Sequence, residues 1–236
     1  MSASFTPALF TFLSELAANN TREWFEANRT RYERDVLEPM LHFIEHLHPR
    51  LVRVAPGFVA DARRSSGSLF RIHRDTRFSP DKSPYKRHIA ARFLHRAQPR
   101  GRQGPAFYLQ LEPGDSFGGG GIYHPDMPTL TRIRHAIIDD AKGWRAVRRT
   151  GIRIEGDSLR RAPAGFDPAH PFIEDLRRKD LYAITPFSEE EVCAPDFLDR
   201  YVDVCAQVAP LVRFLARAVG LEEASTATTA GRGSRR

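Results

Sequence analysis

The chain has 236 residues, of which 41% are hydrophobic and 28% are charged, and its formal net charge at pH 7 is +7. This composition is typical of a soluble globular protein with a substantial core. No apolar run reaches the length of a membrane span, no secretory signal is visible, and the two cysteines fit neither a disulfide framework nor a metal pattern. We expect one globular domain over residues 1–221, located in the cytoplasm and not in a membrane, and a disordered basic tail over 222–236.

Helices are predicted at both ends of the chain. Thr6-Pro7 combines a capping hydroxyl with proline at the first helical position, which predicts a helix start. A second helix is expected to open at residues 20–23, and Pro39 should kink it or restart it because proline removes a backbone donor. Near the C-terminus, apolar residues repeat at helical spacing over 195–219, which predicts a long amphipathic helix.

The middle of the chain alternates between apolar and polar residues, as strands do. Phe107, Leu109 and Leu111 are expected to point inward, and the residues between and after them outward. The same argument predicts strands at 69–78, 88–94, 106–112 and 116–123, and a short last strand at 181–184. Because the strands cluster at about 69–123 and the helices flank them, we predict an α+β fold with a mostly antiparallel central sheet.

Four consecutive glycines, Gly118 to Gly121, interrupt the last of the central strands. Glycine weakens a strand, so some neighbour must require backbone without side chains. The pattern leaves two interpretations open: close approach of a ligand or of a long side chain such as Arg74, or a bulge or tight packing against a helix.

The most informative stretch is residues 69–89, where basic residues gather around a turn. Six positive charges, against two from Asp75 and Asp81, are carried by Arg71, Arg74, Arg77, Lys82, Lys86 and Arg87. Strand alternation turns Arg74 inward, and an inward guanidinium needs a carboxylate or a bound anion. The prolines at 80 and 84 then reverse the chain and should return Tyr85 and Lys86 toward Arg74.

This stretch resembles a known family. The pattern Arg71-x-x-Arg74-Asp75-x-Arg77-Phe78-x-x-Asp81-Lys82-x-x-Tyr85 is similar to the signature of a bacterial and fungal family catalogued as domain of unknown function 2461. The resemblance extends from about Phe5 to the last helix and includes Trp24-Phe25, residues 112–117 and residues 159–166. It implies one shared fold and one shared site, and it implies no particular chemistry.

The leading functional hypothesis is a basic pocket for a small phosphorylated or carboxylated ligand. Arginine matches such oxygens bidentately. The predicted ligand-binding residues are Arg71, Arg74, Arg77, Lys82, Tyr85 and Lys86. If the protein is an enzyme, Asp75 or Glu112 is the candidate base, Tyr85 the candidate proton donor, and Arg74 and Lys86 would stabilise charge.

Three other interpretations stay open. The charged residues could satisfy one another in a structural salt-bridge network within an interaction protein. They could instead bind nucleic acid, with help from Arg100 and Arg102 in an exposed loop. A metal on His73, Asp75, Glu112 and His124 is conceivable but scattered, so we predict no metal site. The sequence names no cofactor, and it does not indicate an oligomeric state.

Overall fold

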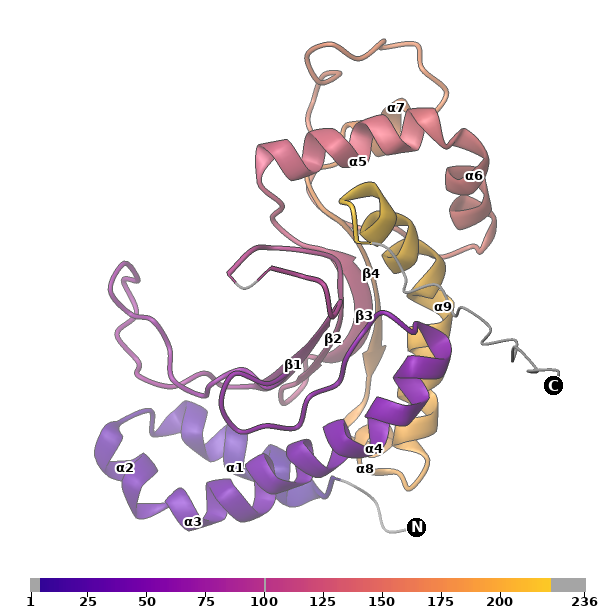
Figure 1. Cartoon of the computed structure of the whole chain (residues 1–236). Helices are drawn as coiled ribbons and strands as arrows, with labels where there is room; N and C mark the ends of the chain where they lie inside the picture. The colour runs from indigo at the N-terminus through magenta and orange to yellow at the C-terminus, as the bar shows by residue number, and fades with distance from the viewer. Residues whose placement is uncertain (1–4, 100, 222–236) are drawn as a thin grey trace, which may run out of the picture.

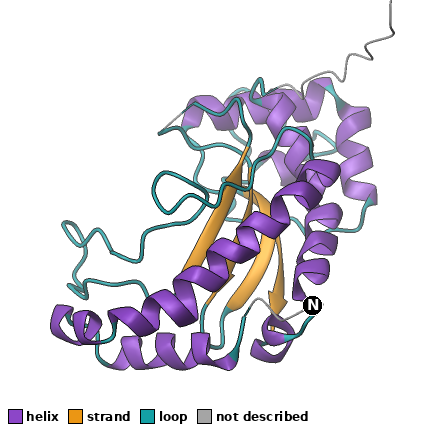
Figure 2. Cartoon of the chain, turned by 60° about the horizontal axis from the view of Figure 1, so that its bottom comes forward, coloured by secondary structure: helices purple, strands orange, loops and turns teal. Residues whose placement is uncertain are grey.

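The computed structural model describes residues 5–99 and 101–221, so the tail predicted at 222–236 and Arg100 lie outside the described residues. Helices and a four-stranded antiparallel sheet form an α+β fold, as the sequence predicted, and Figure 2 shows the strands bordered by helices at both ends. The N-terminal helices are α1 (Pro7–Ala18), α2 (Arg22–Ala27), α3 (Arg29–Tyr32), the π-helical turn η1 (Glu33–Leu37) and α4 (Glu38–Val54). The later helices are α5 (Met127–Asp139), α6 (Ala141–Arg149), α7 (Ile173–Leu176), α8 (Glu189–Cys193) and α9 (Phe197–Ala218).

The sheet follows chain order, β1-β2-β3-β4, and every neighbouring pair is antiparallel (Figure 1). Its strands are β1 (Ile89–Leu94), β2 (Ala106–Leu111), β3 (Ser116–Ile122) and β4 (Leu181–Phe187). Three predicted central strands are therefore confirmed. The short strand predicted at 181–184 is longer and forms the edge beside β3, so the sheet extends well beyond residue 123.

The strand predicted at 69–78 is wrong. The segment makes only isolated bridges, Leu69 with Ala91 of β1 and His73 with Tyr85 before β1, and it turns at residues 77–78. Leu69 and His73 are four positions apart, whereas their partners are six positions apart, so the ladder breaks between the two bridges. The alternation of residues 69–74 predicted an extended chain correctly, but alternation carries no information about such a break.

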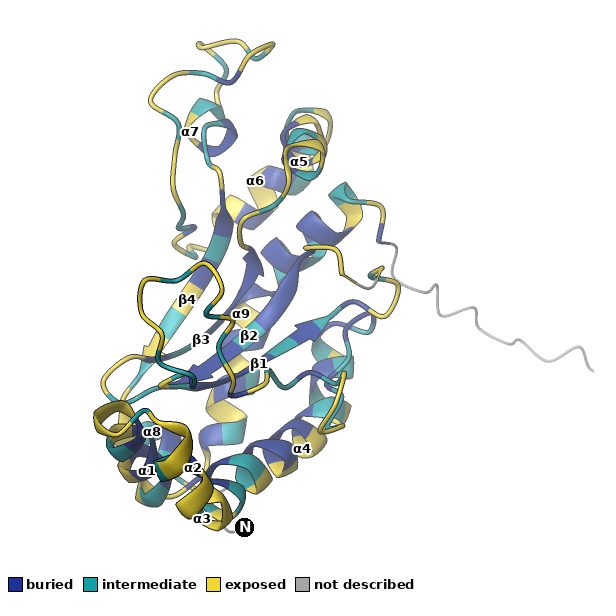
Figure 3. Ribbon diagram, turned by 90° about the vertical axis from the view of Figure 1, so that its left-hand side faces the viewer, coloured by how far each residue is buried: buried dark blue, intermediate teal, exposed yellow. Residues whose placement is uncertain are grey.

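One face of the sheet is covered by helix α9, and no helix among the described residues crosses the other face (Figures 1 and 3). Inward residues of the strands meet aromatic residues on the covered side: Phe93 contacts Tyr201 of α9, and Phe107 contacts Phe58. Helix α4 packs on α9 through Phe43, whose ring lies 5.6 Å from that of Tyr201. The uncovered face is concave and flanked by loops, and ligand sites are usually concave.

The restart predicted at Pro39 takes the form of the π-helical turn η1, directly before α4. A proline removes an intrahelical hydrogen bond, and a π turn is one way in which a helix accommodates a local mismatch. The chain passes from α3 to α4 without a loop, and the buried residues Val36, Met40 and Phe43 stay on the core side.

Helices α5 to α7 form a smaller layer at the end of the sheet near Ile122 (Figure 1). Asp126 caps α5 by accepting a hydrogen bond of 2.8 Å from the backbone of Thr129. The indole of Trp144 is fully buried and donates to the carboxylate of Asp175 at 2.8 Å. Glu155, after α6, makes one isolated antiparallel bridge with Tyr182 of β4.

Candidate functional site

The basic loop of residues 71–87 satisfies much of its own charge. Arg77 makes two hydrogen bonds to Asp75, from Nε at 3.0 Å and from Nη2 at 2.7 Å. This guanidinium holds the pKa of Asp75 at about 2, so the carboxylate is ionised at neutral pH and is a weak base. The ammonium of Lys82 donates to the backbone carbonyl of Thr76 at 2.9 Å.

Arg74 finds its partner inside the same loop. Its guanidinium pairs with Asp81 and also contacts the hydroxyl of Ser79 at 3.3 Å. Asp81 in turn accepts hydrogen bonds from the hydroxyl and the backbone of Ser83, which with Arg74 hold its pKa well below the usual range. The carboxylate required by an inward Arg74 is therefore supplied by the chain itself.

Tyr85 and Lys86 point to opposite sides of the extended chain. The ring of Tyr85 is buried and stacks on Phe25 of α2, with 4.1 Å between ring centroids. Burial raises the pKa of Tyr85. Lys86 lies over the ring of Phe70, with its Nζ 5.0 Å from the centroid. The structure thus separates the side chain of Tyr85 from that of Lys86, since the first packs on Phe25 and the second on Phe70. Anion binding by the loop itself stays a prediction.

Asn20 fastens the loop to the N-terminal helices. Its side-chain amide donates to the carbonyl of Tyr85 and accepts from the amide of Tyr85, each at 3.0 Å. The Asn20 side chain thus satisfies both backbone groups of Tyr85, as a neighbouring strand would do in a sheet.

We expect Asn20→Ala to lower the free energy of unfolding by about 1–3 kcal/mol, because two partly buried backbone groups lose their partner. Urea denaturation followed by circular dichroism measures the change. Asn19→Ala is the matched control, since Asn19 is exposed and its side chain makes one local hydrogen bond to the carbonyl of Glu15. Equal losses in the two variants would contradict a special role for Asn20.

The uncovered face of the sheet holds a pocket of about 580 Å³. Aromatic side chains and glycine backbone dominate its lining, together with Arg92 of β1 and Gln110 of β2. The pocket is lined by Phe70, Arg92, Gln103, Gly104, Ala106, Tyr108, Gln110, Phe117, Gly119, Gly120, Gly121, Tyr123, Tyr182 and Ile184. We call this space the concave pocket.

Two cations contact the ring of Phe70, which lines the concave pocket. The guanidinium carbon of Arg92 lies 5.4 Å from the centroid of Phe70, and the ammonium of Lys86 lies 5.0 Å from it. Arg92 donates to the neutral side chain of Gln103 at 3.2 Å, and no carboxylate pairs with Arg92 or Lys86 within the described ranges. Burial lowers the pKa of Lys86, and the charge of nearby Arg71 lowers it further.

A chain of hydrogen bonds runs along β2 on the same face. The hydroxyl of Tyr108 donates to Oε1 of Gln110 at 2.9 Å, and Nε2 of Gln110 donates to Oε2 of Glu112 at 3.1 Å. The same carboxylate oxygen lies 3.3 Å from Nδ1 of His88. Burial raises the pKa of Tyr108 to about 12, so its hydroxyl keeps its proton. Of the three candidate catalytic residues, only Glu112 lies on this face.

The glycine run serves packing on both sides of β3. A Cβ on Gly118 or Gly120 would lie 2.7 Å from Tyr201 or Val212 of α9, and one on Gly119 would lie 2.1 Å from the carbonyl oxygen of Ala183 in β4. The interpretation as tight packing is therefore confirmed. Because these residues lack side chains, their backbone also forms part of the floor of the concave pocket.

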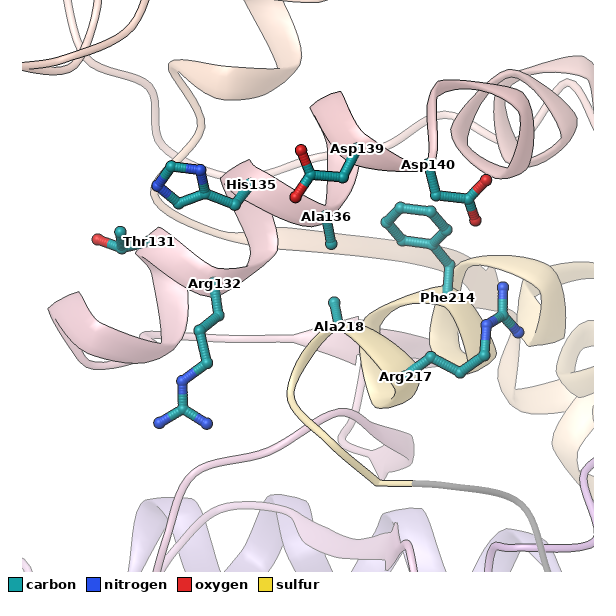
Figure 4. Close-up of a pocket in the computed structure, with 9 residues that line it drawn as sticks. All are labelled: Thr131, Arg132, His135, Ala136, Asp139, Asp140, Phe214, Arg217 and Ala218. Atoms are coloured by element: carbon teal, nitrogen blue, oxygen red, sulfur yellow. The ribbon is translucent and has the colours of Figure 1, made fainter.

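A second hollow of about 510 Å³ lies between α5 and the end of α9 (Figure 4). Ala136 and Ala218 point toward one another across it, and Arg132 and Arg217 lie at its border with Asp139. Its charges include both signs, and the hollow is more open than the concave pocket. It offers no set of groups that converge on one point.

Within residues 5–99 and 101–221, no group of three or more His, Cys, Asp or Glu residues could hold a metal ion. His73, Asp75, Glu112 and His124 are thus not gathered into a metal site. In the same ranges no helix combines the length and the apolar character that crossing a membrane requires.

Sequence reasoning missed Phe70, Arg92 and Tyr108 as site residues. A signal was present for Arg92, because it occupies an outward position in a strand whose inward neighbours are apolar. Nothing in the sequence showed that the outward side of β1 and β2 would be left without a covering helix. That fact depends on where α9 packs.

The chain was compared with known proteins at the level of families, curated sequences and solved structures. A family model matches residues 8–214, which is most of the chain. No curated protein and no solved structure matches it. The resemblance noted from the sequence is therefore confirmed at the level of the family, and the chain belongs to the family DUF2461, described as a conserved hypothetical protein.

Proposed function

We propose that the protein binds a small anionic ligand, phosphorylated or carboxylated, in the concave pocket. The observation that carries this proposal is a pair of cations without a carboxylate partner among the described residues: Arg92, which lines the pocket, and Lys86, which contacts the lining residue Phe70. A partly buried cation is costly when unpaired, so an external anion is the partner that this wall lacks.

The aromatic ring that both cations contact favours the same conclusion. Phe70 holds Arg92 and Lys86 by cation–π contacts, which orient both side chains without neutralising their charge. Arg71 lies close enough to lower the pKa of Lys86, so a third positive charge adds to the local potential. The side-chain oxygen of Gln103 uses only one donor of the Arg92 guanidinium, which leaves others for an oxyanion.

The size and lining of the pocket suit a small ligand with a flat apolar part. Its volume of about 580 Å³ lies in the range that ligand pockets occupy. Tyr108 and Phe117 lie 5.7 Å apart on its floor, and Tyr182 lies at its far side. This lining supports an apolar contact next to the charged contact at Arg92 and Lys86.

The charged loop plays a structural part in this proposal. The ion pairs of Arg74 with Asp81 and of Arg77 with Asp75 stabilise the turn from which Lys86 emerges. This combines two of the initial hypotheses: a salt-bridge network in the loop and an anion pocket beside it.

We expect Arg92→Met and Lys86→Met each to weaken the binding of inorganic phosphate, citrate or phosphoenolpyruvate by about tenfold or more, since a charge-assisted hydrogen bond contributes about 1.5–3 kcal/mol. Isothermal titration calorimetry on the full chain measures the affinities. Methionine keeps the apolar stem over Phe70 and removes only the charge.

Arg149→Met is the control, because Arg149 is exposed on α6 and its side chain makes no hydrogen bond or ion pair within the part of the chain that the structure describes. Affinities unchanged in both Met variants, or no binding of any of the three anions to the wild type, would refute the proposal. Tighter binding of a mixed oligonucleotide than of the small anions would instead support the nucleic-acid hypothesis.

A further inference from the structure

Glu112 and His88 face each other at the end of the sheet face that forms the concave pocket. The pairing of Ile89 with Leu111 places the residue before β1 opposite the residue after β2. Nδ1 of His88 lies 3.3 Å from Oε2 of Glu112, and the two side chains are 27% and 19% exposed. Both are thus partly accessible to a ligand and mostly withdrawn from water.

The hydrogen-bond chain along β2 fixes which nitrogen of His88 is free. Gln110 is buried, and its amide is oriented by the hydroxyl of Tyr108, so its Nε2 donates to Oε2 of Glu112. The carboxylate can only accept from His88, which assigns the proton to Nδ1 and leaves a lone pair on Nε2. A carboxylate that orients a histidine in this way prepares the imidazole to act as a base.

The electrostatic surroundings keep this imidazole neutral. Burial lowers the pKa of His88, the positive charges of Lys86 and Arg87 lower it further, and Glu112 opposes them. His88 is therefore available to accept a proton at neutral pH.

The residues around the pocket restrict the chemistry that such a base can perform. None of the lining residues is a serine, threonine or cysteine, so the lining offers no thiol and no aliphatic hydroxyl as a nucleophile. Tyr108 keeps its proton, because burial raises its pKa to about 12. Beyond the lining, at the end of the same sheet face, His88 is a base oriented by Glu112, and the ammonium of Lys86 is close enough to influence the pKa of His88.

We infer that His88 is a general base that removes a proton from the carbon next to a carbonyl group of a small anionic carbonyl compound. This inference rests on the proposed anion binding, with Arg92 holding the anionic group. The carbon–hydrogen bond breaks, the proton goes to Nε2, and the electron pair forms the carbon–carbon double bond of an enolate. The ammonium of Lys86 stabilises the charge on the enolate oxygen. Return of the proton from Nε2 to carbon restores both partners, so no further reactant is needed.

The first test measures the tautomer of His88. Long-range nitrogen–proton correlation spectra of the labelled full chain should show a proton on Nδ1, a bare Nε2 and a pKa below 6.5. In Glu112→Gln the pKa should fall further, because the carboxylate that raises it is gone. A proton on Nε2 at neutral pH would overturn the inference.

The second test measures proton transfer directly. The wild type is incubated in D₂O with pyruvate, 2-oxobutyrate or dihydroxyacetone phosphate, and deuterium incorporation at carbon is followed by proton NMR. We expect at least one probe to exchange, and we expect His88→Gln to slow that exchange by about 10²–10⁴-fold. His135→Gln, which changes an exposed histidine on α5, should exchange at the wild-type rate.

The pH profile and the variants separate a catalytic role from a structural one. Exchange should decline as the pH falls below the pKa of His88, since protonation removes the lone pair. Glu112→Gln should lower the exchange rate at saturation, whereas Arg92→Met should mainly raise the concentration required for saturation.

The two proposals fail in different ways. If calorimetry detects no anion binding to the wild type, the proposed function itself is refuted. If the probes bind but exchange no faster with the wild type than with His88→Gln, the general-base role is refuted and the binding function stands.

Discussion

Replacing Gly121 with alanine is expected to lower the free energy of unfolding by at least about 3 kcal/mol, because the new side chain meets backbone atoms that cannot move aside. A Cβ on Gly121 would lie 2.2 Å from the carbonyl oxygen of Leu181 and 2.4 Å from Cα of Tyr182, both in the paired strand β4. The φ angle of Gly121 is +144°, a conformation that side chains rarely adopt. Urea denaturation of the purified variant measures the loss.

Gly114→Ala is the matched control for this experiment. Gly114 also has a positive φ, +73°, but a Cβ there would meet nothing within 4 Å. Its substitution should lower the free energy of unfolding by only about 1 kcal/mol, because only the left-handed backbone conformation is then unfavourable. Comparable losses for the two variants would show that contact with β4 contributes nothing, and the packing explanation of the glycine run would then be wrong.

The strands illustrate what local pattern can predict. Ile89, Ala91 and Phe93 alternate with Ala90 and Arg92, and the structure buries the first three, with Phe93 against Tyr201 of α9. Side-chain alternation is a property of the extended chain itself, so the sequence suffices to detect it. The break in pairing beside residues 69–74 depends on the partner strand, and no local pattern records it.

The candidate site was harder to predict because it lies on the sheet face that no described helix covers. The sequence directed attention to the charges of Arg74, Arg77 and Lys82, and the turn gives each of them a partner nearby. Arg74 and Asp81 are seven positions apart, so the geometry of the turn decides whether they form an ion pair. The outward position of Arg92 is visible in the sequence, but its place in a pocket becomes apparent only when α9 is known to lie on the opposite face of the sheet.

The glycine run shows a similar limit. Four glycines in a strand predict that some neighbour requires backbone without side chains, but the sequence does not identify that neighbour. The structure places α9 on one side and the backbone of β4 on the other. The run therefore lets the sheet lie close to its helix while leaving an open floor on the concave side.

Replacing Asp180 with alanine is expected to lower the free energy of unfolding by about 2–4 kcal/mol, because one buried carboxylate ties three segments together. Its Oδ1 accepts from the backbone amide of His124 at 2.7 Å, and its Oδ2 accepts from the backbone amide of Asp157 at 3.3 Å. His124 has a φ of +48°, a strained conformation for a histidine that this hydrogen bond helps to hold. The two amides would lose their acceptor in the variant. Urea denaturation measures the loss.

Two further variants sharpen the Asp180 experiment. Asp180→Asn should lose about half as much stability, since an amide oxygen can still accept from His124 while the amide nitrogen cannot accept from Asp157. Asp115→Ala, at an exposed side chain without a partner within residues 101–221, should stay within about 0.5 kcal/mol of the wild type.

Hydrogen exchange tests the role of Asp180 most directly: the amide of His124 should lose protection in Asp180→Ala. Tyr123 and Tyr182, which flank this hydrogen bond, line the concave pocket, so anion affinity should fall in the same variant. Retained protection at His124 would mean that Asp180 does not hold this side of the pocket.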